Sequence, residues 1–262
     1  MKAEKKRKLI DAVREMGFSE QEASGMILSG KILIDGNRET RSGIFIQTSS
    51  KITVLKSKEY VSRSAEKLAG ALSDFSLDVC GRACLDLGAS TGGFVQVLLE
   101  KGARKVYAVD VGYNILDYSL RRDAKVAVLE RHNVKDLNIS WFSDEDMDAF
   151  QKKERLFVTC DISFMSLKTV VSSLVSFLEK EKISCDGVFL LKPQFEDSRN
   201  TEKGILADDS LREQIVRNTE QFLDSSGIAV KGILPARIKG ASGNQEFVIS
   251  FSYPADSASL SG

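Results

Sequence analysis

The residues best suited to hold a ligand stand in one run of the sequence, Cys84-Leu85-Asp86-Leu87-Gly88-Ala89-Ser90-Thr91-Gly92-Gly93-Phe94. An apolar stretch leads into this run, and a helical pattern follows it. Glycines there let the backbone approach a ligand closely, and a helix start points free N–H groups at it. A dinucleotide site would read G-x-G-x-x-G. Here an acidic residue comes two positions before the first glycine, which suits a ligand with an ammonium group. The run therefore predicts a loop for S-adenosylmethionine, bound by Asp86, Gly88, Ala89, Ser90, Thr91, Gly92, Gly93 and Phe94.

A second acidic position fits the same ligand. Asp110 ends the next apolar stretch, 24 residues after Asp86. A carboxylate at that point of an α/β fold can bind both ribose hydroxyls of an adenosine. We also assign Val111, the next residue, and Asn133, beyond the following strand, to the predicted cofactor pocket.

Four charged residues far apart in the sequence form a possible catalytic group: Lys67, Asp161, Lys192 and Glu246. Asp161 and Lys192 each follow a predicted strand directly. Because the carboxyl ends of parallel strands surround one crevice, both should share the cleft with the glycine-rich loop. A lysine is unusual directly after a buried stretch such as 187–191, where Lys192 stands. Taken singly, however, each of the four charged residues is more often exposed to solvent at the end of a strand.

The elements that must position these residues follow from the hydrophobic pattern. Strands are predicted at 83–87, 105–109, 125–129, 155–160, 186–191, 227–233 and 246–252, and helices at 92–101, 115–121, 166–180 and 209–225. This alternation predicts an α/β fold with a Rossmann-like sheet of seven largely parallel strands and helices on both faces. Only the connection 235–244 separates the last two strands, which favours a final antiparallel hairpin.

A smaller domain is predicted ahead of this sheet. Helices are expected at 4–16 and 20–29, the second with Ser19 and Glu22 as a capping box, followed by short strands at 31–34 and 51–55. We expect residues 1–57 to form this domain, 58–81 a linker and first helix, 82–254 the catalytic domain, and 255–262 a flexible tail. Residues 1–67 hold 14 lysines and arginines against nine acidic residues, so the first part of the chain is the basic part.

Composition excludes several kinds of site. The four cysteines contain no C-x-x-C pair and His132 is the only histidine, so neither a metal site, a disulfide framework nor a Ser-His-Asp mechanism is expected. No segment approaches the roughly 20 apolar residues that span a bilayer. The N-terminus lacks the apolar core of a signal peptide, so we expect a cytoplasmic protein without membrane partners.

The first domain resembles the small αL-type RNA-binding domain of ribosomal proteins, with G-F-S-x-x-x-A near its middle and S-G-K-I-L-I-D-G at its end. The resemblance covers roughly residues 5–56. It implies RNA backbone contacts from Lys31, Arg38 and Arg41. Members usually carry a basic residue straight after the capping serine, where this chain has Glu20, so part of the expected positive charge is missing.

Seven motifs along nearly the whole chain resemble the TlyA family, also known as hemolysin A: Y-V-S-R-S-A-E-K-L, L-D-L-G-A-S-T-G-G-F, Y-A-V-D-V-G-Y, V-L-E-R-H-N, C-D-I-S-F-M-S-L, L-L-K-P-Q-F-E and G-A-S-G-N-Q-E-F. That family is related to the FtsJ-type ribose methyltransferases. The resemblance implies 2′-O-methylation of ribosomal RNA at cytidine, a Lys67-Asp161-Lys192-Glu246 tetrad, and an RNA contact at Arg63. Ser64 departs from the glycine of the family's S-R-G motif.

The chemistry of such a transfer fits the tetrad. A ribose 2′-hydroxyl is a poor nucleophile at neutral pH, so methyl transfer needs in-line positioning and help in removing a proton. Two neighbouring lysines lower each other's pKa, and the two carboxylates can orient them. Lys192 is thus a possible general base with Lys67 as its partner, and an electrostatic role for both lysines stays open.

Four other functions compete with this interpretation. A pseudouridine synthase shares the first domain but would need a different catalytic domain. D-I-S-F loosely resembles the acidic motif of amino-methyltransferases, although paired lysines favour a hydroxyl target. A membrane-damaging toxin would need apolar or amphipathic segments of membrane length. A non-catalytic RNA-binding or ribosome-assembly factor would fail to bind S-adenosylmethionine.

Overall fold

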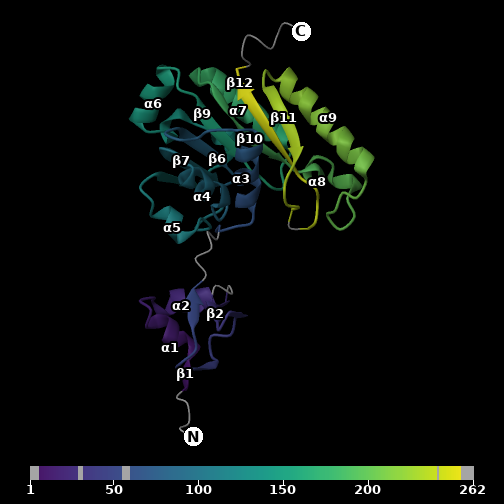
Figure 1. Ribbon diagram of the computed structural model, residues 1–262. Helices are drawn as coiled ribbons and strands as arrows, with labels where there is room; N and C mark the ends of the chain where they lie inside the picture. Colours follow the sequence, from purple (N-terminus) through teal and green to yellow (C-terminus); the bar gives the residue numbers. More distant parts are fainter. Residues whose placement is uncertain (1–5, 29–31, 55–59, 241, 255–262) are drawn as a thin grey trace. The chain divides into compact units, whose positions relative to one another are not determined.

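The computed structural model describes residues 6–28, 32–54, 60–240 and 242–254 of the chain. The chain divides into two compact units, residues 1–59 and 60–262 (Figure 1). The first unit contains β1 (Lys6–Lys8), α1 (Leu9–Arg14), α2 (Glu20–Leu28), β2 (Ile32–Ile34), β3 (Asn37–Glu39), β4 (Phe45–Gln47) and β5 (Ile52–Val54).

The second unit contains the strands β6 (Ala83–Leu87), β7 (Lys105–Asp110), β8 (Val126–Glu130), β9 (Leu156–Cys160), β10 (Cys185–Leu191), β11 (Ala229–Pro235) and β12 (Phe247–Tyr253). Its α-helices are α3 (Ser64–Asp74), α4 (Gly93–Glu100), α5 (Tyr118–Arg121), α6 (Asp144–Gln151), α7 (Leu167–Glu181), α8 (Pro193–Glu196) and α9 (Asp209–Ser225). Short 3-10 turns lie at Val134–Asp136, Ile139–Trp141 and Ser198–Asn200.

The first unit packs two helices against small antiparallel sheets, one in the order β3-β2-β5 and one formed by β1 and β4. The capping box at the start of α2 is present: Glu22 N donates to Ser19 Oγ at 3.3 Å, and Ser19 N donates to Glu22 Oε2 at 2.8 Å. The helix predicted at 4–16 is wrong at its beginning, because 6–8 pairs with β4 as a strand. Those three residues are all basic and offer no apolar stripe, so strand pairing prevails there over helix formation.

The second unit is built on one sheet with the strand order β11-β12-β10-β9-β6-β7-β8. The five strands from β6 to β10 run parallel, whereas β12 is antiparallel to both of its neighbours. The predicted Rossmann-like α/β fold is confirmed, and so is the final antiparallel pair. β12 pairs with β10 on one side and with β11 on the other, so the last strand in the sequence lies inside the sheet and β11 forms its edge.

Side chains of the strands alternate between the two faces of the sheet, so each face carries apolar residues. Helices cover both faces (Figure 1). Leu85 and Leu87 belong to a core shared with α6, α7 and α9. Cys84, on the opposite face, belongs to a core shared with α3, α4 and α5. No helix within the described residues is long and apolar enough to cross a membrane.

Sequence reasoning missed α6, although its start carries a clear signal. Ser143 caps this helix by accepting from Asp146 N at 3.2 Å, and the first turn is acidic, which suits the positive end of a helix dipole. Asp146 also accepts from Tyr107 Oη on β7 at 2.5 Å and pairs with Arg104 at 2.7 Å. Tertiary contacts thus hold a helix whose own apolar pattern is weak.

The strand order fixes where a ligand can bind. From β6 the chain moves outward to β7 and β8, then returns to the other side of β6 through β9 and β10. The crevice at this switch point, beyond the carboxyl ends of β6 and β9, is the usual binding place in an α/β sheet. The glycine-rich loop follows β6, and Asp161 follows β9.

Candidate functional site

The glycine-rich loop is tied to the end of β7 by its own backbone. Gly88 N and Ala89 N both donate to Val109 O, at 2.9 and 3.0 Å. Gly88 has a φ of +86°, and a Cβ there would lie 2.8 Å from Ile162 Cγ1. Only glycine therefore lets this loop pass so close to the segment that follows β9.

The two later glycines of the loop face protein atoms. A Cβ on Gly92 would lie 2.3 Å from Leu120 Cδ1, and one on Gly93 would lie 2.2 Å from Ser62 Oγ. Both positions serve close packing, of α5 in one case and of the segment before α3 in the other. Neither residue belongs to the lining of the two cavities described below, where the sequence predicted a ligand contact.

Asp110 ties the loop to the turn after β7 through the two oxygens of its carboxylate. Oδ2 accepts from Ser90 N at 2.8 Å, and Oδ1 accepts from Gly112 N at 2.7 Å. Ser90 itself has a φ of +49°. The carboxylate thus fixes an unusual backbone turn while its partly exposed side stays available to a ligand.

A cavity of about 320 Å³, which we name the Asp110 cavity, opens at this point. The residues that line it are Leu87, Gly88, Ser90, Val109, Asp110, Val111, His132, Asn133, Val134, Asp161, Ile162, Ser163, Phe164 and Met165. It brings together Asp110, Val111 and Asn133, the three residues assigned to the cofactor from outside the glycine-rich run.

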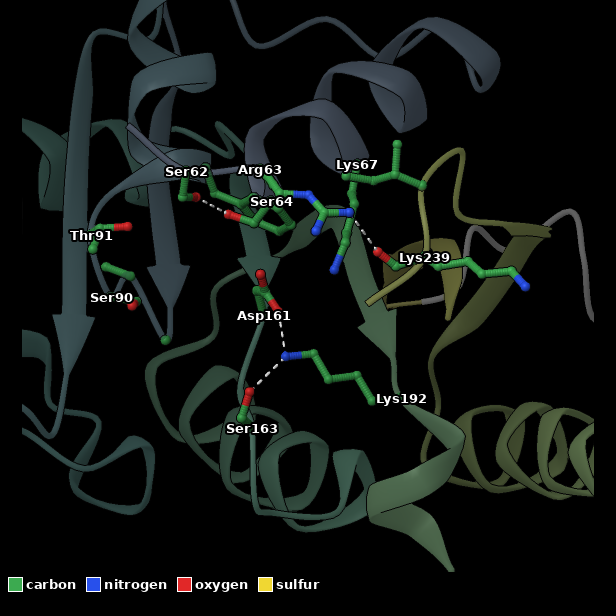
Figure 2. A pocket seen from close by; sticks show the side chains of 14 residues that line it. Ser62, Arg63, Ser64, Lys67, Ser90, Thr91, Asp161, Ser163, Lys192 and Lys239 are labelled. Atoms are coloured by element: carbon green, nitrogen blue, oxygen red, sulfur yellow. Dashed lines mark hydrogen bonds and ion pairs between the residues drawn. The ribbon is translucent and has the colours of Figure 1, made fainter. Parts of the chain in front are cut away.

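A second cavity of about 330 Å³, the lysine cavity, lies next to the first (Figure 2). The residues that line it are Ser62, Arg63, Ser64, Lys67, Gly88, Ala89, Ser90, Thr91, Phe94, Asp161, Ser163, Lys192, Ile238 and Lys239. The two cavities share Gly88, Ser90, Asp161 and Ser163. Ligands bound in the two cavities would therefore lie next to each other, both in contact with these shared residues.

The tetrad residues lie together as two ion pairs. Lys192 Nζ is 2.6 Å from Asp161 Oδ1 and donates to Ser163 Oγ at 2.8 Å, so both partners point at the same amine (Figure 2). Lys67 Nζ donates to Glu246 Oε2 at 2.6 Å. Burying an ammonium group is costly unless it is paired, and each buried lysine here has a carboxylate partner.

Each tetrad residue comes from a different element. Lys67 lies in the first turns of α3, and Glu246 directly precedes β12. Asp161 follows β9, and Lys192 is the residue between β10 and α8. Glu246 is only 3% exposed and lines neither cavity, and a Cβ on Gly240 would lie 2.3 Å from its Oε1. It therefore acts on Lys67 from behind the cavity wall.

The side chain of Asp86 is completely buried in β6 and is not among the residues that line the two cavities. Thr159 Oγ1 donates to its Oδ1 at 2.7 Å, and its buried Oδ2 has no hydrogen-bond partner among the described residues. Burial raises the pKa of the Asp86 carboxyl to about 7, against the opposing effect of the Thr159 hydrogen bond.

Several residues of the lysine cavity were missed by sequence reasoning. Ser62 and Ser163 lie inside quoted motifs, but a serine hydroxyl alone gives no spacing signal. Ile238 and Lys239 come from the connection before β12 and are brought in by the fold. Arg63 reaches across the cavity, where its Nη2 donates to Lys239 O at 3.5 Å (Figure 2).

The predicted RNA-contacting residues are divided between the units. Arg38 is exposed on β3. Arg41 donates to Glu39 from Nε at 3.0 Å and from Nη2 at 2.9 Å, which offsets part of its charge. Arg63 lines the lysine cavity of the second unit. Lys31 lies outside the described residues. Within the described ranges, no group of three or more His, Cys, Asp or Glu side chains is arranged to hold a metal.

Comparison with known proteins gives consistent matches. Residues 60–253 match the family described as FtsJ-like methyltransferase. The chain is 36% identical to hemolysin A of Brachyspira hyodysenteriae over 93% of this chain and 99% of that protein. It is 38% identical to the 16S/23S rRNA (cytidine-2'-O)-methyltransferase TlyA of Mycobacterium tuberculosis over 90% of this chain and 85% of that protein. A solved chain from Streptococcus thermophilus, named as a candidate hemolysin, superposes with a TM-score of 0.67 at 31% identity, over 95% of this chain and 89% of the other.

The raised pKa of Asp86 predicts that its contribution to stability falls as pH rises. An unfolded aspartate ionises at about pH 4, whereas folded Asp86 keeps its proton up to about pH 7. Between these values the folded state binds more protons, so raising the pH from 5 to 7 should cost about 2 kcal/mol of unfolding free energy. Asp86→Asn removes this titration. Urea unfolding of both proteins at the two pH values measures the effect, and equal pH dependence would contradict it.

Proposed function

The chain belongs to the TlyA (hemolysin A) family, whose catalytic domain is an FtsJ-like methyltransferase, and from that premise we propose that it transfers a methyl group from S-adenosylmethionine to a ribose 2′-hydroxyl of ribosomal RNA, at cytidine. One observation supports this most directly. Two buried lysine–carboxylate pairs stand beside a cavity that shares four residues with a second cavity at the switch point of the sheet.

The Asp110 cavity suits the cofactor. Its volume lies in the range of small-molecule sites. Gly88 lets the loop pass close to Asp161 and Ile162, where the two cavities share their wall, and apolar walls at Val109 and Met165 suit a base. We assign Asp110 to the ribose hydroxyls, and Val111 and Asn133 to the adenine. S-adenosylmethionine would supply a methyl group made electrophilic by its sulfonium.

The remaining loop residues hold the amino-acid end of the cofactor in this proposal. Gly88, Ala89, Ser90 and Thr91 line the lysine cavity, with Phe94 at the start of α4. Asp86 is buried in β6 directly before the loop, and once ionised its carboxyl would place negative charge near a cationic ligand. Gly92 and Gly93 support the loop through packing.

The lysine cavity suits the target hydroxyl because Lys192 is held by two partners. The amine nitrogen is bonded to its side-chain carbon, donates a hydrogen bond to Ser163 Oγ and lies 2.6 Å from Asp161 Oδ1 in an ion pair. The side chain of Lys192 also lines the cavity. A neutral amine would offer a lone pair there and accept the hydroxyl proton, whereas an ammonium group would offer a third N–H to the developing oxyanion.

Lys67 supports the same reaction from the other side of the cavity. Its ion pair with Glu246 keeps the positive charge in one place, and burial strengthens its field on a negatively charged oxygen. Arg63 and Lys239 bring further positive charge to the same cavity, which suits an RNA backbone. The first unit would add affinity for the RNA through exposed basic residues such as Arg38.

Cofactor binding provides the first test. Asp110→Ala should weaken binding of S-adenosylmethionine about 10-fold or more, because it removes hydrogen bonds to a charged group and releases Ser90. Isothermal titration calorimetry measures the affinity. Asp117→Ala is a matched control, since Asp117 also accepts from a backbone N–H, that of Ser119 at 2.8 Å, but lines neither cavity. Equal affinity of Asp110→Ala and wild type would exclude the ribose assignment.

Single-turnover methylation of ribosomal RNA tests the reaction itself. Wild type should methylate a cytidine ribose, and Lys192→Ala should do so about 100-fold more slowly while binding the cofactor normally. Lys192→Arg keeps the charge but cannot be deprotonated. A slow arginine variant supports the base, and a nearly normal one supports the electrostatic role. If wild type transfers no methyl group to ribosomal RNA, the proposed function is wrong.

Salt dependence tests the role of the first unit. Each lost phosphate contact should reduce the slope of log affinity against log salt concentration by about 1. Arg38→Ala should therefore weaken RNA binding and flatten the slope, as measured by fluorescence anisotropy in a salt series. Arg217→Gln, which removes an exposed arginine of α9, is the control. An unchanged slope for Arg38→Ala would argue against this contact.

A further inference from the structure

The two chain segments that carry Asp161 and Lys192 remain joined beyond the ends of their strands. β9 and β10 pair in parallel up to the partners Cys160 and Phe189. Past that point Lys192 contacts Asp161 and Ser163. Further along, the rings of Phe164 and Phe195 lie 5.1 Å apart between centroids.

The last contact between the segments is made by Glu196, the final residue of α8. Its Oε1 accepts from Leu167 N at 2.6 Å, and its Oε2 accepts from Ser166 Oγ at 2.5 Å. Leu167 begins α7 and Ser166 is its N-cap, so the carboxylate sits at the positive end of a 15-residue helix. Both motifs, C-D-I-S-F-M-S-L and L-L-K-P-Q-F-E, end at this contact.

The start of α7, to which Glu196 is bound, is held firmly by the core of the sheet. Leu167, Val170 and Val171 of α7 are 4% exposed or less and belong to the main core of the sheet. α8 has only four residues, and it starts at Pro193 directly after Lys192. The backbone of Lys192 is thus held between a core strand before it and a pinned turn of helix after it.

We propose that Glu196 is a positioning residue for Lys192: by fastening α8 to the start of α7, it sets the angle at which the Lys192 amine faces the lysine cavity. This inference rests on the proposed methyl transfer. Glu196 does not line the lysine cavity, so it acts through Lys192 and not on the substrate. In-line transfer is sensitive to displacements of about 1 Å, which gives such an anchor a large effect on rate.

A double-mutant cycle tests the proposal. Glu196→Ala should lower the single-turnover methylation rate about 10-fold in the wild-type background and less than about 2-fold in the Lys192→Ala background, because the residue it positions is then absent. Affinity for S-adenosylmethionine and the KM for RNA should stay unchanged. Glu196→Gln keeps an acceptor for Leu167 N and a donor for Ser166 Oγ, so it should restore most of the rate.

Asp208→Ala is the matched control for loss of a helix cap. Asp208 accepts from Ser210 N at 2.9 Å and from Leu211 N at 3.1 Å at the start of α9, and it lines neither cavity. It should lower the melting temperature much as Glu196→Ala does and leave the methylation rate unchanged. Equal rate losses for Glu196→Ala in the two backgrounds, or an equal loss for Asp208→Ala, would overturn the proposal.

Amine labelling separates this proposal from the proposed function. Lys192 and Lys67 are each 8% exposed, and acetylation of both by acetic anhydride can be followed by mass spectrometry in any variant, active or not. Glu196→Ala should raise labelling of Lys192 several-fold relative to Lys67, whose pair with Glu246 is untouched. An unchanged ratio would refute the positioning role even if wild type methylates RNA. A raised ratio in a protein that does not methylate RNA would refute only the function.

Discussion

The ion pair between Lys192 and Asp161 is the constraint on which the second unit depends. A lysine that is 8% exposed needs a carboxylate within contact distance, or the cost of removing its charge from water is not offset. The two residues meet because β9 and β10 are parallel neighbours, although β10 continues two residues beyond Phe189, the partner of the last β9 residue, Cys160. Helices on both faces of the sheet connect the parallel strands, and β12 pairs with β10 on the side away from β9. Together they hold β9 and β10 in this register.

A second constraint acts at the same edge, where the backbone of Gly88 passes against Asp161 and Ile162. A side chain there would push the loop away from the segment after β9 and separate the two cavities. With glycine, four residues line both cavities, and Asp161 can pair with Lys192 while it forms part of the Asp110 cavity wall. One carboxylate thereby forms part of the wall of both cavities.

How far the sequence predicted this structure depended on the kind of signal. Strands of the main sheet follow from apolar runs, and Asp161 and Lys192 stand out because charge directly after a buried strand is unusual, whereas the grouping of Lys67 and Glu246 with them depends on the family resemblance. The depth of Asp86 was not predictable, since its spacing before Gly88 is the same whether its side chain faces a ligand or Thr159. Ser163 gave no signal of its own, and β1 depends on pairing with β4, which no local pattern contains. The start of α6 carries a capping signal, but its apolar pattern is weak.

The two lysines of the site are held to different degrees, and this bears on their roles. Among the described residues, Lys192 Nζ donates a hydrogen bond to Ser163 Oγ and forms an ion pair with Asp161, so two partners restrict its movement. In the part of the chain that the structure describes, Lys67 Nζ contacts only Glu246 and has more freedom to turn about its last bond. Proton removal and a directed hydrogen bond both require a fixed angle, whereas the field of a positive charge varies little with rotation. The geometry therefore suits Lys192 to the directional step and Lys67 to the electrostatic one.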